Sequence, residues 1–115
     1  MDIQEHSTGT VIVFALHGRL TLESFGRLRD RVRTLVDQGG RRLVLDLSGV
    51  SYVDSIGVAE LVRCQVIVGN QGGQLVLAEL PTQITRLLHV TKLDQIFARF
   101  GTVAQAIEHV AQTDA

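Results

Sequence analysis

The sequence predicts an α/β domain whose mixed sheet opens with a β-hairpin. Two strand patterns, at residues 3–6 and 10–17, flank the turn residues 7–9. Two further short apolar strands, at 43–45 and 74–78, alternate with longer segments of helical pattern. The hairpin is antiparallel, whereas right-handed helical crossovers make the later strands parallel. We therefore expect one sheet that contains both kinds of pairing.

Length and composition are those of one ordinary globular domain spanning residues 1–115. With 45% apolar residues and a net charge of −1, the chain differs from disordered proteins and lacks the basic character of nucleic-acid binders. The single cysteine, Cys64, has no partner for an intrachain disulfide, so a reducing cytoplasm is expected. No apolar run approaches the roughly 18 residues that span a bilayer, and residues 1–5 do not resemble a signal peptide.

The first helix is expected over residues 22–38, with Thr21 as its N-cap and the glycines at 39–40 as its end. Its apolar residues follow the spacing of a single core-facing stripe, and the opposite face is charged. The stripe consists of Phe25, Leu28, Val32, Leu35 and Val36.

The last third of the chain predicts two further helices. Pro81 suits the first helical position of a helix that ends near residue 89, with Ile84, Leu87 and Leu88 directed inward. Residues 96–97 are interpreted as a short extended segment beside the sheet. Residues 102–105 have a capping-box pattern that starts the last helix, and the tail at 112–115 is expected to fray.

The stretch from 43 to 62 organises the rest of the chain. Its strand ends at Asp46, and a helix over 56–68 follows the sequence Asp54-Ser55-Ile56-Gly57. Ser55 falls at the N-cap or in the first turn, at the positive end of the helix dipole. We expect Asp46 and Asp54 to converge on the Ser55 hydroxyl. Such a corner could hold a metal, activate a nucleophile or present a serine to a kinase.

The same helix is expected to bury one side and expose the other. At 100° per residue, the core side contains Val58, Leu61, Val62, Gln65 and Val68, of which Gln65 needs a hydrogen-bond partner or an edge position. The opposite stripe consists of Ile56, Glu60, Arg63 and Ile67. Two exposed isoleucines indicate a partner interface, and a neighbouring helix that covers them is an equally good interpretation.

The sequence gives little support for catalysis or for a bound cofactor. The four histidines are scattered without an i, i+4 pair, and Asp46 with Asp54 supplies fewer oxygens than calcium requires, although magnesium with a nucleotide is conceivable. Val53 stands where a Gly-x-Ser-x-Gly elbow needs glycine, and no P-loop is present. The only lysine, Lys92, lies outside any clear strand, which disfavours a receiver domain. No catalytic residue, metal site or cofactor is expected.

The residues at 45–48, the run Val53-Asp54-Ser55-Ile56-Gly57, and Leu61 resemble the signature of STAS domains, in particular the anti-sigma factor antagonists. The Gly-x-Leu turn at 18–20 and the Val-Thr-x-Leu sequence at 90–93 fit the same family, so the resemblance covers nearly the whole chain. It implies a mixed sheet with helices packed mainly on one face.

The resemblance also implies a function. The unphosphorylated protein would bind a GHKL-type serine kinase that acts as an anti-sigma factor, the kinase would phosphorylate Ser55, and a PP2C-type phosphatase would reverse the modification. Asp46, Asp54 and Gly57 would surround the phosphosite. Thr21 replaces an aspartate common in the family, in a turn expected at the partner interface. The alternative function is a STAS subunit of a lipid-transport or membrane-transport complex that is never phosphorylated; a small enzyme is a third and weaker candidate.

Overall fold

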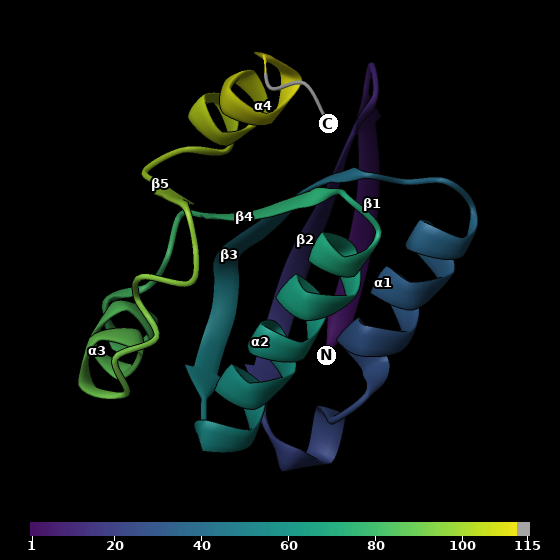
Figure 1. The fold of residues 1–115 in the computed structure, drawn as a ribbon. Helices are drawn as coiled ribbons and strands as arrows, with labels where there is room; N and C mark the ends of the chain where they lie inside the picture. Colours follow the sequence, from purple (N-terminus) through teal and green to yellow (C-terminus); the bar gives the residue numbers. More distant parts are fainter. Residues whose placement is uncertain (113–115) are drawn as a thin grey trace.

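The computed structural model describes residues 1–112 and contains a five-stranded sheet in the order β1-β2-β3-β4-β5 (Figure 1). The strands are β1 (Asp2–Thr8), β2 (Val11–Leu20), β3 (Arg42–Val53), β4 (Gln74–Ala78) and β5 (Arg99–Phe100). The helices are η1 (Leu22–Ser24, a 3₁₀ turn), α1 (Arg27–Asp37), α2 (Ser55–Asn70), α3 (Thr82–Val90) and α4 (Val103–Gln112). β1 pairs with β2 antiparallel and the other pairs are parallel, which confirms the mixed sheet opened by a hairpin.

The sheet has helices on both faces, with the larger core on one of them. α1 and α2 lie side by side against one face, and α4 packs on the other at the far end of the sheet (Figure 1). The larger core joins inward residues of β2, β3 and β4 to α1, α2 and α3; its strand members include Phe14, Leu16, Leu43, Leu45, Leu47, Leu75 and Leu77. The smaller core under α4 contains Val11, Val13, Val44, Val76, Ala78, Ala106 and Val110. The helices are therefore packed mainly on one face, as expected.

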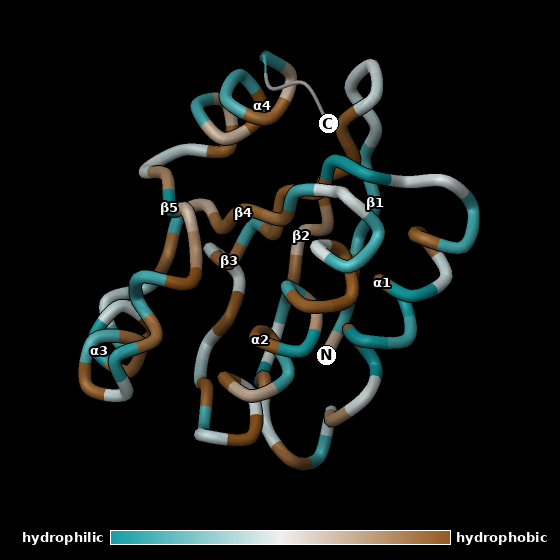
Figure 2. The backbone as a smooth tube through the Cα atoms, in the orientation of Figure 1, coloured by the Kyte–Doolittle hydropathy of each residue, from teal (hydrophilic) through white to brown (hydrophobic). Residues whose placement is uncertain are grey.

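Strands β2, β3 and β4 are buried on both faces where α4 covers them, which explains their continuous apolar runs. Figure 2 shows hydrophobic residues concentrated along these strands, whereas the edge strand β1 is mostly hydrophilic. A polar edge strand protects the sheet from pairing with other chains.

The first predicted helix is interrupted. η1 ends at Ser24 with Phe25 as its C-cap, and Gly26 adopts a left-handed conformation with φ of 95° before α1 begins at Arg27. The break takes Phe25 out of phase with the core stripe, so Phe25 is 44% exposed and its predicted burial is wrong. The other four members of the stripe are buried as predicted.

Strand β3 is much longer than the sequence indicated, because it continues past Asp46 to Val53. Its register against β2 shifts after Ala15 and again after Gly18, and β3 carries the extra residue each time. These bulges interrupt the alternation of apolar and polar residues by which a strand is recognised. The extension carries the chain to the corner where α2 begins.

The C-terminal third follows the prediction with small shifts. β4 has the expected bounds, Ile84 and Leu88 of α3 are buried, and Leu87 is half-buried. Pro81 is the N-cap of α3 instead of its first helical residue, and the C-terminal strand lies at 99–100 instead of 96–97. The Gln105 N–H donates to Thr102 Oγ1 at 3.1 Å, as a capping box requires. Of the tail at 112–115 that was expected to fray, Gln112 is the last residue of α4, and 113–115 lie outside the described residues.

Candidate functional site

The candidate site is the corner between β3 and α2, and Asp54 fixes its shape. Asp54 is the N-cap of α2: its Oδ1 accepts a hydrogen bond from the Gly57 N–H at 2.8 Å. Its Oδ2 accepts from the Leu22 N–H at 3.3 Å, and its own N–H donates to the Leu20 carbonyl at 3.3 Å. One residue thus ties the start of α2 to η1 through its carboxylate and to the end of β2 through its backbone N–H.

Gly57 allows the first turn of α2 to approach the backbone of β2. It is buried, and a Cβ added there would overlap the carbonyl group of Leu20 and press on Val53. The obstruction is backbone, which cannot rotate away as a side chain can. The glycine of the Asp-Ser-x-Gly sequence is therefore required by close packing.

Ser55 is the first residue of α2, and it is exposed. Its hydroxyl makes no hydrogen bond within residues 1–112, because Asp54 supplies the cap. Of the two positions that the sequence allowed, the structure selects the first turn. The first N–H groups of a helix have no acceptor inside it, so the Ser55 hydroxyl lies in a positive backbone environment. It is free to accept a modifying group.

Asp46 does not join this corner, contrary to the prediction. It lies within β3 between Ala15 and Ala78 of the neighbouring strands, and its Oδ1 accepts from the Ser48 N–H at 3.0 Å. Asp46 lies two residues after Val44 in β3, so both side chains are on the same face of the sheet, the face covered by α4. α2 covers the opposite face. The strand from Asp46 to Val53 also separates them by about 20 Å, at roughly 3.3 Å per residue.

The predicted interface stripe on α2 is only partly exposed. Ile56 and Arg63 are exposed, Ile67 is half-buried against the core, and Glu60 is completely buried. The prediction that Glu60 faces a partner is wrong because α1 packs alongside α2 and covers this position. The alternative interpretation, a neighbouring helix that covers both isoleucines, is wrong for Ile56, which is exposed, and Ile67 is covered only in part. On the other side of α2, Gln65 donates from Nε2 to the Ile96 carbonyl at 3.0 Å, which meets its expected need for a partner.

Glu60 instead caps α1. Its Oε2 accepts hydrogen bonds from the N–H groups of Gly26 and Arg29, each at 3.0 Å. Gly26 is the N-cap of α1 and has no side chain to serve as an acceptor, so a carboxyl group from α2 takes that place. A negative group at a helix N-terminus is also favoured by the helix dipole.

Thr21 is not a surface residue either. It is only 6% exposed, and its N–H donates to Ser24 Oγ at 3.1 Å. Its role is to shape the turn. The next residue, Leu22, projects outward and is 66% exposed.

Exposed hydrophobic side chains gather around Ser55. Leu22 and Phe25 lie in and after η1, which is bonded to Asp54, and Ile56 follows Ser55 directly. The set, which we call the apolar collar, consists of Leu22, Phe25, Tyr52, Ile56 and Val90. Elsewhere in residues 1–112 the large exposed hydrophobics are Val66 and Ile96. A soluble domain rarely exposes such a cluster unless a partner covers it.

Four members of the apolar collar were missed from the sequence: Phe25, which was predicted to be buried, and Leu22, Tyr52 and Val90. A signal existed for Leu22, because it is an apolar residue of a predicted helix that lies outside the inward-facing stripe. Val90 gave none, because the third helix was expected to end near residue 89. Tyr52 gave none, since β3 was expected to end before it.

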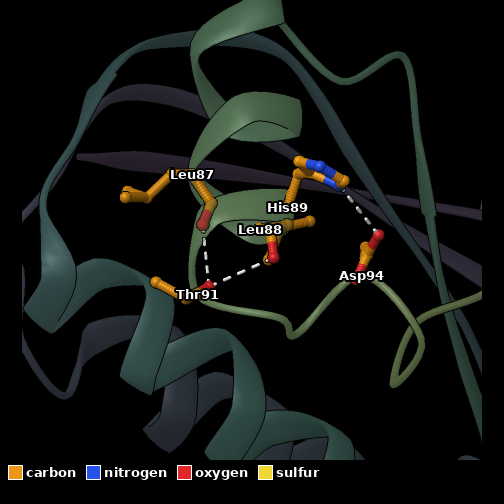
Figure 3. A network of polar contacts seen from close by, with 5 residues as sticks. All are labelled: Leu87, Leu88, His89, Thr91 and Asp94. Atoms are coloured by element: carbon orange, nitrogen blue, oxygen red, sulfur yellow. Dashed lines mark hydrogen bonds and ion pairs between the residues drawn. The ribbon is translucent and has the colours of Figure 1, made fainter.

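A groove of about 520 Å³ separates the corner from α3. One wall is formed by residues 52–55, and the other by one face of α3: Thr82, Gln83, Arg86, Leu87 and Val90. Figure 3 shows how the C-terminal end of α3 is held: the Thr91 hydroxyl lies within hydrogen-bond distance of the carbonyls of Leu87 and Leu88, at 2.7 and 3.2 Å. His89 Nδ1 lies 3.4 Å from Asp94 Oδ2 in the same network. These local contacts close the C-terminal end of α3.

The described residues contain few groups suited to catalysis. Burial, with a smaller contribution from Glu60, raises the pKa of the Cys64 thiol to about 12, so the thiolate nucleophile is scarce at neutral pH. No three His, Cys, Asp or Glu side chains within residues 1–112 are grouped to hold a metal ion. In the same range, every helix is too short or too polar to cross a membrane.

Comparison with known proteins identifies the family. The family model described as "Mlab, STAS domain" matches residues 3–101. The chain is a STAS domain. Among curated relatives of this STAS domain, the anti-sigma-B factor antagonist of Bacillus subtilis is 31% identical over 96 residues, which cover 84% of this chain and 85% of that protein. A TM1081 homologue from Thermotoga neapolitana is 29% identical over 75 residues, covering 65% of this chain and 66% of that protein.

Solved structures share the fold. An anti-sigma factor antagonist from Mycobacterium paratuberculosis superposes with a TM-score of 0.85 at 22% identity, covering 96% of this chain and 94% of that one. The unphosphorylated form of the anti-sigma factor antagonist SpoIIAA gives a TM-score of 0.74 at 19% identity, covering 97% of this chain and all of that one. Part of the murine anion transporter Slc26a9 gives 0.77 at 19% identity, with 94% of this chain covering 19% of that one.

Proposed function

We propose that this STAS domain is an anti-sigma factor antagonist whose binding to an anti-sigma factor kinase is controlled by phosphorylation of Ser55. The observation that carries the proposal is the placement of Ser55, an exposed and unbonded hydroxyl in the first turn of α2, within the apolar collar. The relative from Bacillus subtilis, named as an anti-sigma-B factor antagonist, supports the same role.

The charge of a phosphate is sufficient for a switch. A phosphoserine adds roughly −1.5 to −2 of charge, which the helix N-terminus favours by about 0.3–2 kcal/mol and the adjacent Asp54 opposes. Because these effects are similar in size and opposite in sign, the domain should stay folded. A partner packed on the apolar collar must bury the new charge. A cost of about 3 kcal/mol would weaken binding roughly a hundredfold.

The proposed cycle follows from this. The unphosphorylated protein binds a GHKL-type serine kinase in the cytoplasm and so releases a sigma factor or another client. The kinase then phosphorylates Ser55, and a PP2C-type phosphatase restores the binding form. In this cycle the protein acts as a binding module, and none of the described residues that line the groove is a histidine that could serve Ser55 as a general base.

Replacement of Ser55 tests the switch. We expect Ser55→Asp and Ser55→Glu to bind the purified kinase about tenfold more weakly than wild type, since each adds one negative charge where phosphate adds up to two. Ser55→Ala should bind normally, accept no phosphate, and change the unfolding free energy by less than about 0.5 kcal/mol, because the cap is Asp54. Titration calorimetry, with mass spectrometry after incubation with ATP, measures these effects.

Wild-type affinity of both acidic variants, with folding confirmed by circular dichroism, would contradict the proposal. That result would favour the alternative, a STAS subunit of a membrane-transport or lipid-transport complex. Phosphate found on Ser48 or Ser51 instead would contradict the assignment of Ser55.

The position of the interface has its own test. Leu22→Ser removes an exposed apolar side chain from the apolar collar, and we expect kinase binding to weaken about tenfold, as for an interface residue worth more than 1 kcal/mol. Val66→Ser is the matched control: it is 51% exposed and lies on α2 roughly 16 Å from Ser55, at 1.5 Å per residue. It should bind like wild type. Equal effects of the two substitutions would place the interface elsewhere.

A further inference from the structure

Among the described residues, Arg86 is the one cationic side chain that lines the same groove as Ser55. It is exposed on α3 and has no hydrogen bond or salt bridge with any other described side chain or backbone group. Two other arginines contact aromatic rings of the apolar collar: the exposed Arg19 lies over the ring of Tyr52 at 4.7 Å, and the half-buried Arg29 over that of Phe25 at 5.3 Å. A guanidinium without a partner, facing a serine across a groove, is available to an anion attached to that serine.

We propose that Arg86 is the internal receptor for the phosphate group on Ser55. The inference rests on the proposed phosphorylation, in which the γ-phosphoryl group of ATP is transferred to Ser55 Oγ, the hydroxyl proton is lost and ADP leaves. A guanidinium binds phosphate oxygens through paired, charge-assisted hydrogen bonds. Thr82 and Gln83 line the same wall and add neutral donors.

The proposed contact with Arg86 offsets the electrostatic repulsion between the phosphate and Asp54. Asp54 is adjacent to Ser55 and must keep its carboxylate to cap α2, so a phosphate there meets a like charge that cannot move away. Arg86 supplies the opposite charge from α3. In the proposed contact the guanidinium of Arg86 reaches across the groove that Leu87 and Val90 also line, so phosphorylation covers apolar surface as well as adding charge.

The test uses protein carrying phosphoserine at position 55, installed by genetic encoding and therefore without any kinase. The midpoint of the ³¹P chemical-shift titration should be higher by about half a pH unit in phosphorylated Arg86→Gln than in phosphorylated wild type. This is the size expected for a unit charge about 5 Å away in a water-like medium. Phosphorylated Arg63→Gln is the matched control, because Arg63 is exposed on α2 but roughly 12 Å along the helix from Ser55 and outside the groove.

A second measurement is thermal stability. Phosphorylation should lower the melting temperature of Arg86→Gln by a few degrees more than it lowers that of wild type or of Arg63→Gln. Equal midpoints and equal melting shifts in Arg86→Gln and wild type would overturn the proposal. Equal changes in Arg86→Gln and Arg63→Gln would also overturn it, because they would reflect long-range charge alone. Both readouts come from the isolated domain, so they are independent of whether the kinase releases the phosphorylated form.

Discussion

Replacing Glu60 by alanine should destabilise the domain by about 3 kcal/mol. The substitution leaves the N–H groups of Gly26 and Arg29 without their acceptor inside the α1–α2 contact, and each unsatisfied buried donor costs about 1–3 kcal/mol. It also removes a carboxyl group from the positive end of α1. The relief from no longer burying a charged group offsets part of this loss. Chemical denaturation followed by circular dichroism measures the difference in unfolding free energy.

Two further variants sharpen this prediction. Glu60→Gln keeps an oxygen acceptor of the same shape, so it should lose only about 1 kcal/mol, the difference between a neutral and a charge-assisted hydrogen bond. Glu108→Ala removes a glutamate from the exposed side of α4 and should change stability by less than about 0.5 kcal/mol. If Glu60→Ala behaved like Glu108→Ala, Glu60 would not be the cap of α1. We expect Glu60→Ala to weaken partner binding only in proportion to the loss of folded protein. That result would show that Glu60 does not contribute to the interface directly.

Gly57→Ala should destabilise the domain by about 2–3 kcal/mol, although alanine is intrinsically the better helix former. The new Cβ would overlap the Leu20 carbonyl, which β2 and the Asp54 N–H hold in place. Relieving that overlap shifts the first turn of α2 away from the sheet, and overpacking of this kind typically costs about 1–3 kcal/mol or more. Because Ser55 lies in the same turn, kinase binding should weaken beyond the loss of folded protein. Denaturation and titration calorimetry together measure both effects.

Gly69→Ala is the control on the same helix. Gly69 is exposed, and a Cβ there would meet no atom within 4 Å. The substitution should stabilise the domain by up to about 1 kcal/mol through helix propensity alone. Opposite signs at the two glycines would show that close packing at Leu20 decides the effect at Gly57. A Gly57→Ala variant as stable as wild type would contradict this account of the corner.

The secondary structure could be predicted from the sequence where short-range spacing specifies it. The hairpin, the bounds of β4 and the capping residue before α4 depend on residues within a few positions of one another, and all were found. The corner at Asp54 and Ser55 was located for the same reason. The sequence did not show which of the two residues caps the helix. In the structure Asp54 is the N-cap of α2, and the Ser55 hydroxyl has no partner among the described residues.

Tertiary contacts decided which way the side chains of α2 face. Most sides of this helix are apolar, so its periodicity does not select a buried face, and the burial of Glu60 depends on α1 lying alongside. Asp46 was expected beside Ser55, but β3 continues past it through two bulges. Asp46 therefore lies far from Ser55 and on the face of the sheet opposite to α2.

The family, the sheet with its opening hairpin, and the serine at the start of α2 all follow from the amino-acid sequence. Which residues surround that serine depends on the packing of distant segments. The apolar collar and Arg86 come from segments widely separated along the chain, η1, the end of β3 and α3. Their meeting depends on the length of β3 and on the packing of η1 and α3, and no local spacing in the sequence encodes either.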